Sequence, residues 1–378
     1  LFFFPFLKKI DRPLIVDLIC PNFFEILEDS DDREKGVASV EDLKTRSAFV
    51  LDLYREQLVY GDFFICGSEL QRDLWLGMLT AMGRITPEIY REDKQARNLI
   101  DVVPFGLPSY PPKHTRQVLK GVHKGIQVGD TVLFWGGGLW NWFDPLTPIR
   151  AMAEITKERK DIKLYFSCLK HPNPKTPIPQ KGIDAINLSD QLGVLNKTVF
   201  FNEGWIPYQE REDYLCEVDV GINSHLDSLE TKFAVRTRMW DYFWAGLPVI
   251  SSKGDFIAQE IVKYGLGFVV DFFDERGWRE AILQLARPEL RTTISQNVWN
   301  YTKNLHWEKI IEPLQRFCQN PRRTGGKIVP IRFQSRLEGV RAIPYYLSKA
   351  KTKIKHEGAR EFLRACLRRI RWNLVSRF

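Results

Sequence analysis

The chain has 378 residues, a formal net charge of +8, 44% hydrophobic residues and 13% aromatic residues. A chain of this length and apolar content can bury more than one hydrophobic core, which excludes a wholly disordered protein and favours two domains. No sequence repeat with a period of roughly 20 to 50 residues recurs, and no apolar run reaches the roughly 18 residues of a membrane-spanning helix.

The positive charge is concentrated at the carboxyl-terminal end. Residues 321–378 hold 16 lysines and arginines against three glutamates, a net charge of +13, so the first 320 residues carry −5. A mildly acidic body argues against a protein that binds nucleic acid. Apolar residues recur every four positions among the arginines of this segment: Phe362, Cys366, Ile370, Leu374 and Phe378. This spacing predicts a basic amphipathic helix that binds an anionic membrane surface, with packing against the amino-terminal domain as the alternative.

The six cysteines lie far apart and form no CxxC pair, which indicates a reducing compartment and no zinc site. The opening run, Leu1-Phe-Phe-Phe-Pro5, is typical of the inside of a strand and does not resemble a signal peptide. We therefore expect the amino-terminal domain to be incomplete, without its first strands.

Apolar runs alternate with helical periodicities along most of the chain. The predicted strands cover residues 14–19, 62–67, 100–104, 131–135, 163–168, 198–202, 218–222, 248–251 and 267–270. The predicted helices cover residues 40–59, 69–82, 145–159, 209–217, 236–245, 257–264, 278–286 and 307–317. This order predicts an α/β fold with parallel sheets covered on both faces. Prolines and glycines cluster at 105–113, so we expect domains at 1–105 and 106–320, followed by a basic tail at 321–378.

A glycine-rich loop follows the predicted strand 131–135. It contains Gly136, Gly137 and Gly138, then Trp140 and Asn141, and ends at Asp144 and Pro145, which are typical of a helix start. A strand, a glycine turn and a helix start together allow backbone N–H groups to approach a phosphate. The loop lacks the motif of a P-loop and the spacing of a dinucleotide fingerprint, and a tight turn that only allows sheet packing is the alternative.

Three cations gather near the start of the predicted helix 236–245: Lys232, Arg236 and Arg238. Cations at a helix amino terminus oppose the helix dipole, so their position predicts a bound anion. The alternative is that the arginines are solvated and pair with Glu230 or Asp241.

The run Asp241-Tyr-Phe-Trp-Ala-Gly-Leu-Pro-Val-Ile250, followed by Gly254, Asp255 and Glu260, resembles the Glu-Ala-x-Ala-x-Gly-x-Pro-Val … Gly-x … Glu-Ile signature of glycosyltransferase family 4. Residues 65–71, 103–108 and 200–207 fall where that family has its last amino-domain strand, its linker and its base-binding strand. The resemblance covers residues 14 to 317.

The resemblance implies a GT-B fold, in which two Rossmann-like domains face each other across a cleft and the second domain holds most of the nucleotide sugar. It implies that Asp241 binds the donor ribose and that Gly254, Asp255 and Glu260 belong to the donor site. Eight positions before Asp241 the family has another glutamate, where this chain has Phe233 with Glu230 as the nearest acid.

The family also has a pyrophosphate-binding Arg and Lys after the first strand of its second domain, and residues 136–144 contain neither. We infer that Lys232, Arg236 or Arg238 could supply that charge instead.

Three further residues are candidates for the donor site. His171 follows a predicted strand, where ligands of open α/β sheets bind, with a turn residue as the alternative. Glu203 and Trp205 would frame the nucleobase, unless Trp205 belongs to the core. The acidic run 29–32 shows no ordered ligand spacing and indicates a solvated loop and no metal site.

The sequence thus predicts a hexosyltransferase-like glycosyltransferase that moves a sugar from a nucleotide diphosphate donor to a polysaccharide or lipid-linked acceptor. The resemblance implies retention of configuration, no metal and no cofactor. We expect a cytoplasmic protein attached to the inner face of the cell membrane, and no catalytic residue is assigned. A nucleotide-sugar epimerase or hydrolase on the same fold, or a non-catalytic nucleotide-sugar-binding protein, are the alternatives.

Overall fold

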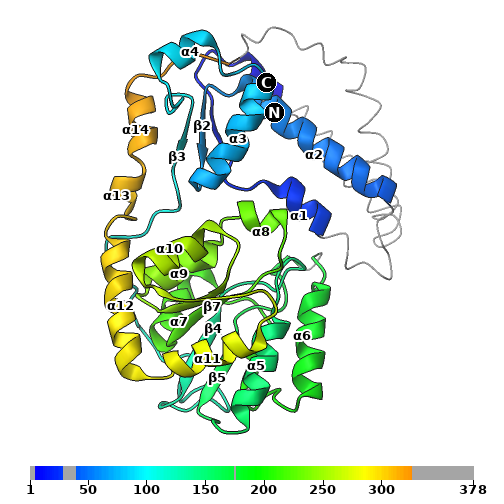
Figure 1. The fold of residues 1–378 in the computed structure, drawn as a ribbon, viewed down its shortest axis with the longest axis vertical. Helices are drawn as coiled ribbons and strands as arrows, with labels where there is room; N and C mark the ends of the chain where they lie inside the picture. Colours follow the sequence, from blue (N-terminus) through cyan, green and yellow to red (C-terminus); the bar gives the residue numbers. More distant parts are fainter. Residues whose placement is uncertain (1–4, 29–39, 174–175, 326–378) are drawn as a thin grey trace.

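The computed structural model describes residues 5–28, 40–173 and 176–325. Two parallel sheets lie one above the other along the long axis of the molecule (Figure 1). The predicted basic helix and the acidic run 29–32 lie outside the described residues. No helix of the described ranges is long and apolar enough to cross a membrane.

The amino-terminal sheet has the strand order β1-β2-β3, with β1 at Ile15–Asp17, β2 at Phe63–Cys66 and β3 at Ile100–Val102. Its helices are η1 (Pro5–Lys9), α1 (Asn22–Glu28), α2 (Val40–Tyr60), α3 (Glu69–Ala81) and α4 (Pro87–Glu92). Trp75 of α3 is fully buried, and its indole N–H donates to the carbonyl of Leu18 at 3.0 Å. This bond satisfies the polar end of a large core side chain.

The second sheet has the order β6-β5-β4-β7-β8-β9. Its strands are β4 (Thr131–Trp135), β5 (Ile162–Phe166), β6 (Val199–Phe201), β7 (Val220–Asn223), β8 (Val249–Ser252) and β9 (Gly267–Val270). In chain order the sheet grows from β4 to one side and then, from β7, to the other. Open parallel sheets bind ligands where the order reverses in this way, which here is between β4 and β7.

Helices cover both faces of this sheet, and every residue of β4, β5, β7 and β8 is buried. The helices of the second domain are α5 (Leu146–Thr156), α6 (Gln180–Gln191), η2 (Tyr208–Glu210), α7 (Arg211–Glu217), α8 (Leu229–Phe233), α9 (Thr237–Trp244), α10 (Phe256–Tyr264), α11 (Glu275–Leu285) and α12 (Pro288–Thr302). Continuous apolar strands are expected where both faces of a parallel sheet are covered. The predicted α/β class is confirmed.

The last two helices, α13 (Trp307–Ile310) and α14 (Glu312–Gln319), return to the first domain (Figure 1). Phe317 stacks on Phe63 of β2 with 4.7 Å between ring centroids, and Arg316 lies 3.2 Å from Asp101 of β3. The end of the stretch 106–320 therefore lies against the amino-terminal sheet. One helix was predicted here, but two form, because Pro313 near the start of α14 cannot donate a backbone hydrogen bond to the preceding turn.

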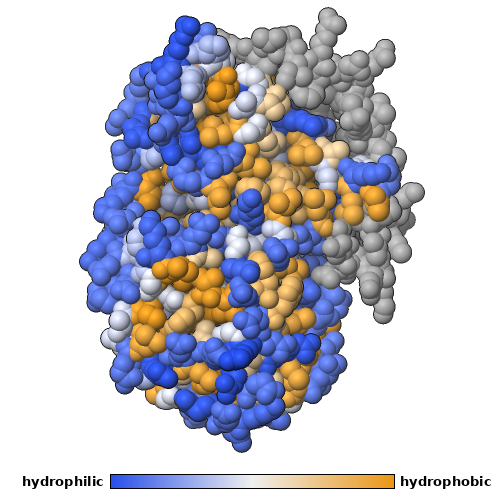
Figure 2. Space-filling model, in the orientation of Figure 1, coloured by the Kyte–Doolittle hydropathy of each residue, from blue (hydrophilic) through white to orange (hydrophobic). Residues whose placement is uncertain are grey.

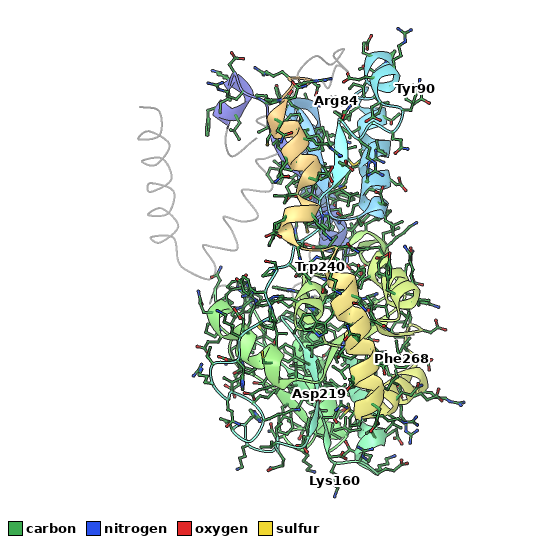
Figure 3. All side chains as sticks on the ribbon, turned by 90° about the vertical axis from the view of Figure 1, so that its left-hand side faces the viewer. Arg84, Tyr90, Lys160, Asp219, Trp240 and Phe268 are labelled. Carbon is green, nitrogen blue, oxygen red and sulfur yellow. The ribbon has the colours of Figure 1, made fainter. Side chains whose placement is uncertain are left out.

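The carboxyl ends of the second sheet face the first domain. Asp219 precedes β7 and Lys160 precedes β5; in Figure 3 Lys160 lies at the end of the molecule that is far from the first domain, and Asp219 lies farther from the first domain than Trp240 does. Trp240 of α9 lies at the junction of the two domains in the same view. The loops that follow β4 and β7 therefore open toward the first domain.

We predict that Gly221→Ala destabilises the second domain. Gly221 lies in β7, where an added Cβ would come within 2.3 Å of the Tyr242 ring, a contact that forces α9 away from the sheet. Overpacking of a core costs about 1–3 kcal/mol, which a urea unfolding curve resolves. The control is Gly77→Ala on α3, where an added Cβ meets nothing within 4 Å. It should raise stability by about 0.5–1 kcal/mol, and equal urea midpoints for the two variants would contradict the prediction.

Candidate functional site

A cavity of about 230 Å³ lies between the two domains, on the side of the second domain where its strands end. The first domain contributes residues that follow β1 and one residue of α1. The second domain contributes the loop after β4 and the approach to α9. The lining residues are Ile19, Cys20, Pro21, Glu25, Phe105, Trp140, Trp142, Phe143, Glu230, Ala234, Val235, Arg236, Thr237 and Arg238.

The glycine loop after β4 is held by hydrogen bonds within the protein. The N–H of Gly136 donates to the Tyr242 hydroxyl at 2.7 Å, and the N–H of Gly137 donates to the Ser167 hydroxyl at 2.7 Å. Gly137 has a φ of +104°, which favours glycine. In this structure the loop is thus a tight turn, and two of its predicted phosphate-binding N–H groups already have partners.

Arg238 lines the cavity and, unlike Arg236, forms no ion pair with an acidic side chain of the described residues. Its guanidinium lies 4.6 Å from the ring centroid of Trp135 and 4.2 Å from that of Phe143, and Nη2 donates to the Gly138 carbonyl at 3.1 Å. Its Nη1 is buried and has no hydrogen-bond partner among the described residues. Burial lowers the pKa of Arg238 to about 10, so the group stays charged at neutral pH.

A buried charge is costly unless a partner compensates it, and no carboxylate of the described ranges forms an ion pair with Arg238. The amino terminus of α9 begins beside it, at Thr237, and no side chain caps this helix. Uncapped N–H groups and the helix dipole both favour a negative charge at this point. The guanidinium and the helix start together make a site that suits an anion.

Arg236 has a different environment, although it is only two residues away. Its guanidinium forms two hydrogen bonds with the Glu230 carboxylate, at 2.8 and 2.6 Å, and both side chains are almost fully buried. A third bond reaches the Thr231 hydroxyl at 3.2 Å. The alternative stated for the arginines therefore describes Arg236, with the correction that the pair is buried and not solvated.

Asp241 makes an ion pair as well, but with a different arginine. Its carboxylate lies 3.4 Å from Nε of Arg211 at the start of α7, and its side chain is 45% exposed. Arg211 in turn stacks on the Tyr208 ring, at 3.6 Å from the centroid. Asp241 does not line the cavity described above.

Two acids predicted at the donor site cap helices. Asp144 accepts the N–H groups of Leu146 and Thr147, both at 3.2 Å, at the start of α5. Asp255 accepts the N–H of Ala258 at 2.8 Å at the start of α10, and burial raises its pKa to about 6. Among the described residues, no three His, Cys, Asp or Glu side chains form a group that could hold a metal ion.

Aromatic side chains from three loops form a row at the carboxyl ends of β4, β5 and β6. Trp140 stacks on Trp142 with centroids 5.7 Å apart, and His171 lies 6.2 Å from Trp140 and 5.5 Å from Trp205. Trp205 is 42% exposed, so it is not a core residue. Asn141, on the same loop, accepts the N–H of Lys181 at 3.4 Å. The structure thus brings together the predicted residues Trp140, His171 and Trp205.

Other predicted residues lie elsewhere. Lys232 is exposed, and it lines a separate surface depression together with Gly254 and Gln259. Glu260 does not line the cavity, and it lies beside Tyr301 of α12, where burial and the Glu260 charge together raise the pKa of the tyrosine. Glu203 is exposed next to Trp205.

Sequence reasoning missed His225, which follows β7 at the point where the strand order reverses. It is fully buried, its Nε2 lies 2.9 Å from the Lys253 carbonyl, and its Nδ1 accepts from the side chain of Asn223 at 3.0 Å. Burial and the nearby Arg236 hold the pKa of His225 well below its usual range, so the ring is neutral. The signal was three polar residues, Asn223 to His225, directly after an apolar strand.

The sequence matches no protein-family model and no curated protein. Solved structures do resemble the fold. A UDP-forming α,α-trehalose-phosphate synthase from Burkholderia xenovorans matches with a TM-score of 0.57 and 11% identity, over 84% of this chain and 71% of that one. WaaG, a glycosyltransferase involved in lipopolysaccharide biosynthesis, matches with a TM-score of 0.52 and 15% identity, over 82% of this chain and 79% of that one.

Sucrose-phosphate synthase from Thermosynechococcus elongatus matches with a TM-score of 0.51 and 17% identity, over 72% of this chain and 61% of that one. The chain therefore spans less than two thirds of that enzyme. These matches confirm the predicted resemblance at the level of the fold, and the chain has a GT-B fold like that of these glycosyltransferases.

Proposed function

We propose that this chain is a glycosyltransferase that takes its sugar from a nucleotide diphosphate donor. The observation that carries the proposal is Arg238, a half-buried side chain whose Nη1 is buried and which has no acidic partner among the described residues, on the wall of a cavity between two domains. A diphosphate is the ligand that such a cation and the uncapped start of α9 suit. The similar trehalose-phosphate synthase is UDP-forming, which supports a nucleoside diphosphate as the leaving group here.

The proposed chemistry follows from where charge develops. When the bond between the sugar carbon and the phosphate oxygen breaks, the electron pair stays on the diphosphate and its negative charge grows. A fixed cation and helix N–H groups stabilise that charge in a site that excludes water. Arg238 would therefore bind the diphosphate in the ground state and stabilise its departure in the transition state.

The aromatic row is the proposed place for the nucleobase. Trp140, His171 and Trp205 lie at the ends of neighbouring strands, and the resemblance assigns base binding to residues 200–207. A purine or pyrimidine can stack on exposed aromatic rings. Gly136 to Gly138 then take a supporting role, because their loop fixes the carbonyl that Arg238 binds.

We further propose a polysaccharide or lipid-linked acceptor at an anionic membrane surface. The net charge of +13 on residues 321–378 supports membrane attachment, since each basic residue near an anionic surface contributes about 1 kcal/mol. WaaG is involved in lipopolysaccharide biosynthesis, which supports an acceptor of the same chemical kind. Retention of configuration and independence of metal are proposed on the family resemblance.

The direct test is transfer of label. The full-length chain should transfer labelled sugar from a UDP-sugar or GDP-sugar to a bacterial membrane extract, and the rate should survive EDTA. Acceptor-independent release of nucleotide would identify a hydrolase, and binding without turnover would identify a non-catalytic protein. Activity that EDTA abolishes and added Mg²⁺ restores would contradict the metal-free mechanism.

Arg238→Met should weaken binding of a nucleoside diphosphate by about 10-fold to 150-fold, because one charge-assisted hydrogen bond is worth about 1.5–3 kcal/mol. Stability should not fall, since the substitution removes a charge that has no acidic partner in the described ranges and whose Nη1 is buried without a hydrogen bond. Isothermal titration with UDP and GDP, together with a thermal melt, measures both quantities. Undiminished affinity for both nucleotides would remove Arg238 from the donor site.

Arg236→Met should give the opposite pattern. It leaves Glu230 buried without its partner, and breaking a buried ion pair in this way costs about 3–5 kcal/mol. The matched control is the double variant Glu230→Leu/Arg236→Met, which should recover most of the lost stability because no charge remains. A single variant as stable as the wild type in urea would show that the pair has no structural role.

A further inference from the structure

The side chain of Gln71, on the first turn of α3, joins the two domains. It is completely buried, and its Nε2 donates to two carbonyl oxygens, that of Ile19 at 2.6 Å and that of Phe233 at 2.7 Å. Ile19 lines the cavity from the first domain. Phe233 is the last residue of α8 in the second domain, directly before the cavity residue Ala234. The side-chain amide of Gln71 thus bonds to one residue beside each wall of the cavity.

Only a primary amide fits this position. Its Oε1 accepts the N–H of Gly67 at 2.8 Å, while its two N–H bonds meet the two carbonyl oxygens. The three partners also determine which end of the amide is nitrogen, because exchanging the two ends would place an oxygen against two oxygens. A glutamate would put a negative charge against both carbonyls.

The packing around Gln71 continues the contact between the domains. Phe24 of α1 stacks on Phe233 with centroids 5.6 Å apart and an angle of 12° between the rings. An added Cβ on Gly67 would lie 2.7 Å from Cγ2 of Val235, so the Val235 side chain packs directly against the Gly67 backbone. Figure 1 shows α8 against α1 and α3, and Figure 2 shows hydrophobic residues gathered over this part of the first domain.

We propose that Gln71 is a positioning residue that sets the separation of the two cavity walls. It fixes residues 233–236 of the second domain, and through them the start of α9 with Arg238, against Ile19 and the residues that follow β1. The catalytic consequence rests on the proposed function. The donor would bind mainly to the second domain, whereas attack by the acceptor needs both walls in register, because small misplacements of reacting groups reduce rates strongly.

Gln71→Ala and Gln71→Glu are the variants, and Trp75→Phe is the matched control. Trp75→Phe also removes a buried hydrogen bond of α3, to Leu18, but that bond stays within the first domain. We expect both Gln71 variants to bind whichever of UDP and GDP the wild type binds with a Kd within threefold of wild type, while kcat for transfer falls at least 10-fold. In Trp75→Phe, both the Kd for the nucleotide and kcat for transfer should stay within threefold of the wild-type values. A Gln71→Ala variant with kcat within threefold of wild type overturns the proposal.

Amide hydrogen exchange on the full chain tests the same role without any activity. Gln71→Ala should speed exchange at least 10-fold in peptides from both domains, those covering 16–22 and those covering 233–238. Trp75→Phe should speed exchange in the first domain alone. Unchanged exchange at 233–238 in Gln71→Ala overturns the proposal. If the wild type neither binds a nucleotide nor transfers a sugar, the proposed function fails, and the exchange result still decides whether Gln71 couples the walls.

Discussion

The site depends on the contact between Tyr242 and the sheet. The ring of Tyr242 packs where Gly221 leaves space in β7, and its hydroxyl donates toward the carbonyls of Phe134 at 2.9 Å and Ile222 at 3.2 Å while accepting the N–H of Gly136. One side chain of α9 thus bonds to the ends of both β4 and β7, the two strands between which the order reverses. This contact brings α9, and with it Arg238, over the glycine loop. Without a glycine at 221 the helix could not come this close.

Arg236 and Arg238 are separated by one residue, but one has a structural role and the other is free to bind a ligand. The Arg236 guanidinium pairs with the Glu230 carboxylate, and two hydrogen bonds between them satisfy most of the polar atoms of both side chains. In the part of the chain that the structure describes, the Arg238 guanidinium contacts one carbonyl and two aromatic rings, which is too little to offset the lost hydration of a full charge. A protein can keep such a group only if folding is stabilised elsewhere, and a ligand that supplies the missing negative charge relieves the cost. The two arginines differ in their partners, although they lie at the start of the same helix: Arg236 is buried with an acid, and Arg238 is half-buried, with Nη1 buried and no acid beside it in the described ranges.

The sequence predicted the fold more fully than the site. All nine predicted strands coincide with observed ones, because buried parallel strands read as apolar runs between turn residues. Helices such as α12 were missed, because its threonines and asparagines obscure the periodicity that its few buried residues, Ile294 and Val298 among them, would otherwise show. Single motifs could not say which arginine pairs with Glu230, because that depends on where α8 places the carboxylate. The first-domain wall, with Cys20 and Glu25, carries no motif at all and becomes visible only when the two domains are placed together.

The two domains are joined at both sides of the cavity by contacts of different strength. On one side α14 packs on the first sheet through Phe317. The chain runs to α14 directly from α12 of the second domain through α13, so the two domains are covalently continuous on this side. On the other side the contact consists of Gln71, the stack of Phe24 on Phe233 and the close approach at Gly67. Breaking the second set loses one hydrogen bond, from Gln71 to the Phe233 carbonyl, and separates two stacked rings, whereas opening at α14 would also require bending the chain. The noncovalent contact at Gln71 is therefore the weaker of the two joins, and it is the one on which the register of the cavity walls depends.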